Sequence, residues 1–256
     1  MTTTENWFNL TGKTCLITGA GYGLGRALVY GMAAHGARVI GLARSAEALK
    51  DTFDVLGDDH RYLVGDLLAD SVYEDLEGLG ETVDILVNNA GGDPFSRPWP
   101  QQTPEEWRLT FDVNVGAAER LCRLFAPSMM RQGWGRIINI ASVYGTLGQD
   151  SRNTLETTGA GAYVAAKHAM VGLTNYLACQ VADRGVTVNT LSPGMIPWWE
   201  STPERQRLWD ALAEKTPVKR NGTPDDFVTA VVFLASPQSG FVNGSNLVVG
   251  GGWSIW

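Results

Sequence analysis

The sequence is poor in the residue types that build metal centres, disulfide frameworks and nucleic-acid surfaces. Its 256 residues include three cysteines and three histidines, and Cys15, Cys122 and Cys179 are scattered without a Cys-x-x-Cys pair or a close histidine. This pattern indicates neither a disulfide framework nor a zinc site, so we predict no bound metal. Scattered thiols fit a reducing setting, and we expect a cytoplasmic protein.

Positive charge and long apolar runs are scarce as well. The 20 Lys and Arg residues are outnumbered by 27 Asp and Glu, which gives a formal net charge of -7 at pH 7. Nucleic-acid and anionic membrane surfaces need clustered Lys and Arg, so we predict neither as a partner. No apolar run approaches transmembrane length and no basic segment followed by an apolar stretch opens the sequence, so we expect a soluble, unprocessed chain. The expected partner is a small molecule.

Short apolar runs alternate with helical segments along the chain. Seven runs have strand character: Thr14–Thr18, Arg38–Leu42, Arg61–Val64, Val83–Val87, Arg136–Ile140, Val186–Leu191 and Asn246–Val249. Continuous apolar strands that alternate with helices predict a parallel sheet covered on both faces. We therefore predict an α/β fold, with a doubly wound parallel sheet of about seven strands in one domain spanning residues 1–256.

Two helices carry boundary signals. The segment Arg26–His35 has helical character and stops at Gly36. Thr103 is the predicted N-cap of a second helix, with Pro104 at its first position, which we expect to continue to about Met130. Residues 195–217 lack a clear core pattern and are interpreted as a substrate lid within the domain.

A glycine-dense turn follows the first predicted strand. Gly19, Gly21, Gly23 and Gly25 carry no β-carbon, so the backbone can approach a pyrophosphate, whose charge is favoured at the N-terminus of the following helix. The spacing differs from the usual Gly-x-Gly-x-x-Gly pattern, which points to a different subclass of dinucleotide-binding Rossmann folds.

Tyr163 and Lys167 form a second pattern. On a helix, four residues place both side chains on one face, about 6 Å apart along the axis. A fixed positive charge there stabilises a phenolate and lowers the pKa of the phenol from about 10. An isolated Tyr-x-x-x-Lys pair is more often part of an exposed helix, but together with the glycine turn it predicts a redox enzyme.

Further motifs occur in order along the chain: Thr18-Gly19-x-x-x-Gly23-x-Gly25, Asn88-Asn89-Ala90-Gly91, Ser142, Tyr163-x-x-x-Lys167 and Ser192-Pro193-Gly194-Met195-Ile196. Over about residues 10–253 the sequence resembles the short-chain dehydrogenase/reductase family. The resemblance implies a single Rossmann domain that transfers hydride between a nicotinamide dinucleotide and a carbonyl or secondary alcohol.

The resemblance also assigns residues. Its implied catalytic set is Asn114, Ser142, Tyr163 and Lys167. Tyr163 would act as general acid or base and Ser142 as a hydroxyl donor to the same oxygen. Lys167 would lower the tyrosine pKa and bind the nicotinamide ribose, and Asn114 would hold a water that connects the lysine to solvent. The structural alternatives are a helix-facing amide for Asn114 and a strand-end turn for Ser142.

The implied cofactor-binding residues are Thr18, Gly19, Tyr22, Gly23, Leu24, Gly25, Arg44, Ser45, Asp66, Leu67, Asn89, Ala90, Gly91, Tyr163, Lys167, Pro193, Gly194 and Ile196. Asp66 resembles the aspartate that meets the adenine amino group.

The residues after the second strand bear on which dinucleotide binds. An NAD-preferring site usually has an acidic residue there, whereas this chain has Ala43 followed by Arg44, which can pair with a 2′-phosphate. Ser45 could donate a further hydrogen bond. The charge pattern favours NADP(H) over NAD(H), unless Arg44 is only a surface residue at a strand end. Tyr22 counts against this, because many NADP-using relatives have a basic residue there.

Substrate signals are sparse. Ser142 and Tyr163 are 21 positions apart, more than the commonest family spacing, and the intervening residues are largely polar. This favours a sugar, a polyol or another polar hydroxylated ketone. The candidate substrate contacts are Ser142, Gln149, Tyr163, Trp198 and Trp199, although the tryptophans could equally form a subunit contact.

The sequence also leaves an alternative substrate and an alternative function open, and it bears on assembly. The alternative substrate is a 3-ketoacyl thioester or a cyclic ketone, and the alternative function is dinucleotide binding without turnover. The family resemblance implies a homotetramer or homodimer, and the apolar aromatic end of the chain, Gly250–Trp256, favours assembly.

Overall fold

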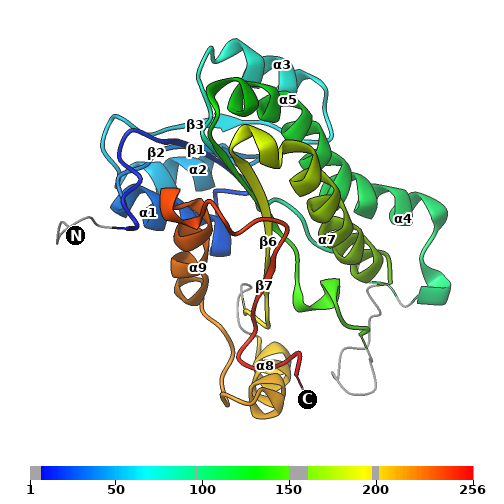
Figure 1. Ribbon diagram of the computed structural model, residues 1–256. Helices are drawn as coiled ribbons and strands as arrows, with labels where there is room; N and C mark the ends of the chain where they lie inside the picture. Colours follow the sequence, from blue (N-terminus) through cyan, green and yellow to red (C-terminus); the bar gives the residue numbers. More distant parts are fainter. Residues whose placement is uncertain (1–6, 96, 98, 150–160, 198–201, 256) are drawn as a thin grey trace.

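One parallel sheet organises the chain. The computed structural model describes residues 7–95, 97, 99–149, 161–197 and 202–255 (Figure 1). Its strands are β1 (Thr14–Thr18), β2 (Arg38–Ala43), β3 (Arg61–Val64), β4 (Ile85–Asn88), β5 (Gly135–Ile140), β6 (Val186–Pro193) and β7 (Asn246–Val249). They pair in the order β3-β2-β1-β4-β5-β6-β7, every pair parallel. The predicted seven-stranded parallel sheet is confirmed, with strand ends that differ from the predicted ones by no more than two residues.

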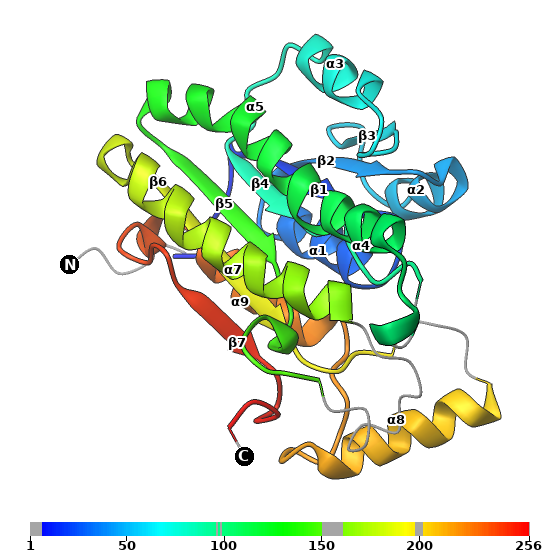
Figure 2. The same cartoon turned by 90° about the vertical axis from the view of Figure 1, so that its right-hand side faces the viewer.

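Helices cover both faces of the sheet. The helices α1 (Gly23–Ala34) and α9 (Asp225–Ala235) pack on one face, and α5 (Ala117–Gln132) and α7 (Gly161–Val181) pack on the other (Figures 1 and 2). Alternate residues of β1 serve the two cores: Ile17 lies in the cluster with α1, and Leu16 in the cluster with α5. Because both faces are covered, the central strands β1, β2 and β4 are apolar on both sides and have largely continuous apolar sequences.

The remaining helices are α2 (Ala46–Phe53), α3 (Ser71–Gly78), α4 (Pro104–Phe111) and α8 (Pro203–Lys215), and α8 lies beside the end of β7 (Figure 1). No helix in the described part of the chain has both the length and the apolar character to cross a bilayer. Nor do three or more His, Cys, Asp or Glu side chains gather as a metal site among those residues.

The structure corrects the start of one predicted helix and adds an internal turn to the other. The first helix begins at Gly23, three residues before the predicted start, because the glycine turn itself winds into the helix. The predicted helix from Thr103 to about Met130 is confirmed at its start, with a complete capping box between Thr103 and Glu106, and it runs without a gap to Gln132. Within it a π-helical turn, Asp112–Gly116, joins α4 to α5, and the sequence did not predict this turn.

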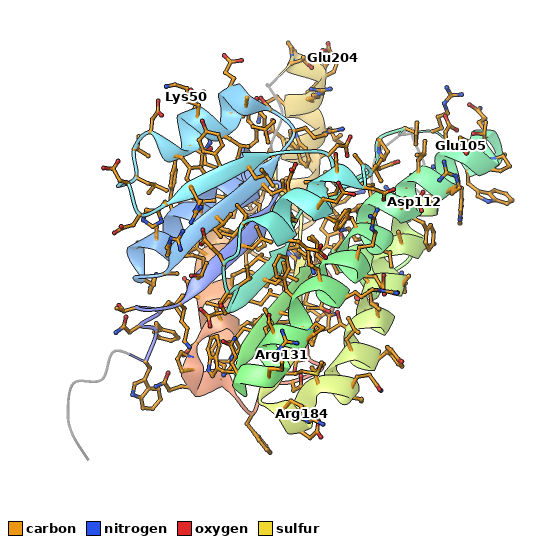
Figure 3. The ribbon with its side chains drawn as sticks, turned by 90° about the horizontal axis from the view of Figure 1, so that it is seen from above. Lys50, Glu105, Asp112, Arg131, Arg184 and Glu204 are labelled. Atoms are coloured by element: carbon orange, nitrogen blue, oxygen red, sulfur yellow. The ribbon has the colours of Figure 1, made fainter. Side chains whose placement is uncertain are left out.

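The π-helical turn presents two different faces. Glu105 and Asp112, both labelled in Figure 3, form ion pairs with Arg108 on the exposed side of α4. Two positions further on, Asn114 is buried and points inward. Because π turns often mark functional sites, this widened turn places Asn114 among the candidate site residues for a second, structural reason.

Candidate active site

The glycine turn lies where the strand order reverses between β1 and β4, the usual ligand position in a doubly wound sheet. Gly19 has a φ of +68° and Gly23 a φ of +50°, a region that favours glycine. A β-carbon on Gly25 would overlap the carbonyl oxygen of Gly19, so the close approach of these two backbones requires glycine at position 25.

The start of α1 suits an anion. Its N-cap residue, Tyr22, is extended and its side chain accepts no hydrogen bond from the helix. Tyr22 thus leaves the first-turn N–H groups uncapped, and together with the helix dipole these groups favour a phosphate. The uncapped helix and the open glycine backbone fit the pyrophosphate of a dinucleotide.

The turn is fixed from two sides. The Thr18 hydroxyl accepts hydrogen bonds from the N–H groups of Asn89 (3.0 Å) and Ala90 (2.9 Å), and Asn89 Nδ2 donates to Thr18 O at 2.8 Å. On the other side Arg26 Nε lies 3.0 Å from both Gly21 O and the Thr52 hydroxyl.

Sequence motifs did not reveal that Arg26 holds the glycine turn through its hydrogen bond to Gly21 O. Its contact with Thr52 crosses from α1 to α2, so no local spacing signals it. Its guanidinium also lies 5.7 Å from the ring centroid of Tyr22, which is 65% exposed.

The residues predicted to bind the adenosine end lie at the ends of β2 and β3. Arg44 is exposed and makes no hydrogen bond or ion pair within the described residues, which leaves its guanidinium available. The Ser45 hydroxyl caps α2 by accepting from Ala48 N at 3.2 Å. Asp66 Oδ1 accepts from Leu68 N at 3.0 Å, and Leu67 is buried between them.

Helix α7 brings the predicted catalytic tyrosine and lysine together. Lys167 Nζ lies 5.4 Å from the centroid of the Tyr163 ring. The lysine is 4% exposed and donates to Ile140 O at 2.9 Å, while Tyr163 is partly exposed. Burial lowers the pKa of Lys167 to about 8. The ammonium therefore keeps its charge at pH 7, beside the phenol.

Asn114 closes the site from the other side. Its Nδ2 donates to Gly92 O (2.7 Å) and Thr110 O (2.9 Å), and its Oδ1 accepts from Gly92 N at 3.0 Å. A β-carbon on Gly91 would lie 2.6 Å from Asn114 Oδ1 and 3.3 Å from Lys167 Nζ. The glycine therefore lets the strand-end backbone, the amide and the ammonium converge.

Ser142 lies two residues beyond the end of β5. It is buried, and its Oγ accepts from Tyr144 N at 3.2 Å, which caps the short 3₁₀ turn Val143–Gly145. The bond uses the oxygen as an acceptor, so the hydroxyl proton remains for a further partner. Both the cap and a substrate bond can therefore form at one time.

A buried polar layer supports this edge of the sheet. Asn88 and Asn139 face each other in neighbouring strands, and Asn88 Nδ2 donates to Asn139 Oδ1 at 2.8 Å. Asn139 Nδ2 in turn donates to the Thr174 hydroxyl on α7 at 2.8 Å. These hydrogen bonds link β4, β5 and α7. Asn139 directly precedes Ile140, whose carbonyl oxygen accepts the hydrogen bond from Lys167.

The region predicted to flank the nicotinamide follows β6. Gly194 N donates to Val249 O at 2.9 Å, and Ile196 is buried. A cavity of about 240 Å³ opens beside Gly194 and is lined also by Arg220 and Phe227, but by none of the four predicted catalytic residues. Gln149 is half-buried, and Trp198 and Trp199 lie outside the described residues.

Comparison with known proteins identifies the family. Residues 19–254 match a family model described as enoyl-(acyl carrier protein) reductase. The 3-oxoacyl-[acyl-carrier-protein] reductase of Vibrio cholerae is 36% identical over 250 residues, which cover 95% of this chain and 98% of that protein. The chain belongs to the short-chain dehydrogenase/reductase family. The predicted oxidoreductase class is thereby confirmed.

Other short-chain dehydrogenase/reductase proteins resemble the chain as closely. The 2-dehydro-3-deoxy-D-gluconate 5-dehydrogenase of Bacillus subtilis is 34% identical and covers 96% of each chain. Among solved structures, a proposed NAD(P)-dependent gluconate 5-dehydrogenase from Beutenbergia cavernae with bound NADP has a TM-score of 0.85 and 36% identity, covering 97% of this chain and 99% of that one. Relatives named for different substrates therefore match nearly the whole chain.

Proposed function

We propose that the enzyme transfers hydride between NADP(H) and a carbonyl or secondary alcohol, with Tyr163 as general acid or base. The observation that carries this proposal is the buried, charged Lys167 placed 5.4 Å from the tyrosine ring. An ammonium in this position favours the phenolate form of Tyr163, which a base near neutral pH requires.

The cofactor would carry the hydride, and side chains of the protein would handle the proton and the charge on the reacting oxygen. The bound cofactor would supply or accept hydride at its nicotinamide ring. In reduction, Tyr163 donates its phenolic proton to the developing alkoxide oxygen, and in oxidation it removes the proton from the alcohol. Ser142 donates its free hydroxyl proton to the same oxygen, a bond that strengthens as negative charge grows there.

Lys167 and Asn114 assist Tyr163 by binding the cofactor and a water molecule. Lys167 also binds the ribose of the nicotinamide with the ammonium protons that Ile140 O does not use. Within the described part of the chain Asn114 Oδ1 accepts one hydrogen bond, from Gly92 N, so its second lone pair is left for a water that leads from Lys167 to solvent.

Tyr163→Phe tests the proposal directly. The variant keeps the ring that packs near Lys167 but has no acidic proton, so we expect turnover to fall by about a thousandfold. Cofactor affinity, measured by quenching of protein fluorescence, should change little. Near-normal turnover with intact cofactor binding would exclude Tyr163 as the acid or base.

We propose NADP(H) as the preferred cofactor. Arg44 supports this preference, because it is exposed at the end of β2 and has no partner within the described residues. An ionic hydrogen bond to a 2′-phosphate contributes about 1.5–3 kcal/mol, so Arg44→Ala should raise the KM for NADPH by roughly ten- to a hundredfold. The KM for NADH should stay within about twofold. Equal effects on both cofactors would contradict the preference.

For the substrate we propose a polar hydroxylated carbonyl or alcohol of the sugar-acid and polyol class. The largely polar sequence before Tyr163 supports this, as do the relatives described as gluconate dehydrogenases. The second candidate is a 3-ketoacyl thioester, favoured by the relatives that reduce 3-oxoacyl carrier proteins. A panel of sugar acids, polyols, ketoacyl thioesters and cyclic ketones, followed at 340 nm, separates them.

The remaining proposals concern shape and assembly. We infer that residues 195–217 form a lid that includes α8, which buries Trp209 and Leu212. We also infer a cytoplasmic homotetramer or homodimer that binds neither nucleic acid nor membrane. Removing the last four residues, Trp253–Trp256, should lower the mass found by light scattering, and an unchanged mass would contradict a role for this end in assembly.

A further inference from the structure

The first turn of α7 carries the tyrosine and receives an acceptor from a distant segment. The helix begins at Gly161, and the N–H of Ala162, the residue before Tyr163, donates to the side-chain oxygen of Gln102 at 3.2 Å. The two residues are 60 positions apart. Gln102 therefore acts on α7 as a capping residue does, although it belongs to the segment that leads into α4.

Gln102 is held where this bond needs it. Its own N–H donates to Trp99 O at 3.3 Å, which closes the 3₁₀ turn Trp99–Gln101. The following residue, Thr103, exchanges two hydrogen bonds with Glu106 in the capping box of α4. Hydrogen bonds on both sides of Gln102 therefore hold its backbone beside the start of α7.

A second contact fits this turn to α7. Gly161 has no β-carbon, and one placed there would lie 3.4 Å from Gln102 Oε1 and 3.4 Å from Trp99 Cδ1. The turn therefore packs directly on the start of the helix. The other atom of the Gln102 amide, Nε2, is buried and makes no hydrogen bond in the described part of the chain, so the oxygen alone carries the interaction.

The position of this bond matters for chemistry. N–H groups in the first turn of a helix have no partner within the helix, and without an acceptor the turn frays. Tyr163 is the next residue, so fraying would move the phenol relative to Ser142 and Lys167. A misplacement of about 1 Å in a reacting group can cost roughly a hundredfold in rate.

We propose that Gln102 is a positioning residue, whose side-chain oxygen holds the first turn of α7 and thereby the phenol of Tyr163. This proposal rests on the proposed function of Tyr163. It predicts that Gln102 affects kcat without contacting the reacting atoms.

The experiment compares four variants. Gln102→Met keeps the length of the side chain and removes the acceptor, and Gln102→Glu keeps an acceptor oxygen and adds a charge that a helix N-terminus favours. The matched controls are Gln101→Met and Gln101→Glu, since Gln101 is the exposed neighbour and makes no side-chain hydrogen bond within the described residues. Amide hydrogen exchange of residues 161–167 is measured by mass spectrometry, and kcat with the best substrate of the panel.

In Gln102→Met the amide hydrogen of Ala162 should exchange roughly fivefold faster, since a capping acceptor contributes about 1 kcal/mol to the stability of a helix terminus. The kcat of this variant should fall at least tenfold while NADPH affinity stays unchanged. Gln102→Glu should restore protection and most of kcat, and both Gln101 variants should match the wild type. Exchange and kcat in Gln102→Met equal to those of Gln101→Met would overturn the proposal.

The exchange measurement also separates this inference from the proposed function. If Tyr163→Phe remained active, the role of the tyrosine would fail, yet exchange at Ala162 would still report whether Gln102 holds the turn. If Tyr163→Phe were inactive and Gln102→Met normal in both measurements, only the positioning role would fail.

Discussion

Lys167 carries a charge at neutral pH in a place where burial opposes it. It is 4% exposed, and burial lowers its pKa from 10.5 to about 8. One pKa unit corresponds to about 1.4 kcal/mol, so the charge costs the folded state roughly 3 kcal/mol at pH 7. Lys167→Met removes the charge, keeps most of the apolar volume, and loses a hydrogen bond to Ile140 O of about 1 kcal/mol. We expect an inactive variant that is about 2 kcal/mol more stable at pH 7.

The gain in stability should depend on pH with a definite sign. Since the folded pKa lies below the unfolded one, the unfolded wild type binds more protons between about pH 8 and 10.5. The wild type therefore becomes more stable, relative to the variant, as the pH rises through this window. The difference in the free energy of unfolding should shrink from about 2 kcal/mol at pH 7 to nearly zero at pH 10.

Urea unfolding of both proteins at pH 7 and pH 10 measures this difference. Lys50→Met is the control, because Lys50 is exposed and pairs with Asp54, so its loss should bring no gain at pH 7. The burial argument is refuted if Lys167→Met proves less stable than the wild type at pH 7, or if the difference is the same at both values of pH.

The sequence predicted the sheet well because the central strands β1, β2 and β4 are largely apolar runs that alternate with helical segments. The ends of the strands were predicted less accurately, since they depend on pairing with neighbouring strands that are distant in the sequence. β6 runs on to Pro193, for example, because Ser192 and Pro193 pair with Val248 and Val249 of β7. The π turn that joins α4 to α5 has a similar origin: Asn114 bonds Gly92, 22 positions away, and the widened turn is where this amide lies.

The proximity of Tyr163 and Lys167 could be predicted from the sequence, but the contacts that hold them could not. Motifs pointed to Tyr163 and Lys167, and a helix necessarily brings such a pair together. No motif pointed to the partners that hold them. Lys167 meets Ile140 O across 27 positions, and Ala162 meets Gln102 across 60. Contacts of this length follow from the strand order and the helix packing, which become visible only in the folded chain.

The remaining predictions concern the effect on stability of substitutions at Gly31, Gly172 and Lys219. Gly31→Ala should destabilise the protein by about 1–3 kcal/mol, because the new methyl group would overlap Val228 Cγ1 where α1 packs on α9. The same change at Gly172, which is exposed on α7 with no atom near its β-carbon position, should instead stabilise by about 0.5–1 kcal/mol, and thermal unfolding of both variants checks the contrast. Lys219 is the one residue other than glycine with a positive φ among the described residues, at 56°. Its left-handed backbone costs about 1–2 kcal/mol, and glycine removes that strain at an entropic cost of about 0.5–1 kcal/mol, so Lys219→Gly should gain up to about 1.5 kcal/mol in urea unfolding. Lys219→Ala keeps the strained backbone and should gain nothing, and an equal gain in both variants would assign the effect to the lost charge rather than to the backbone angle.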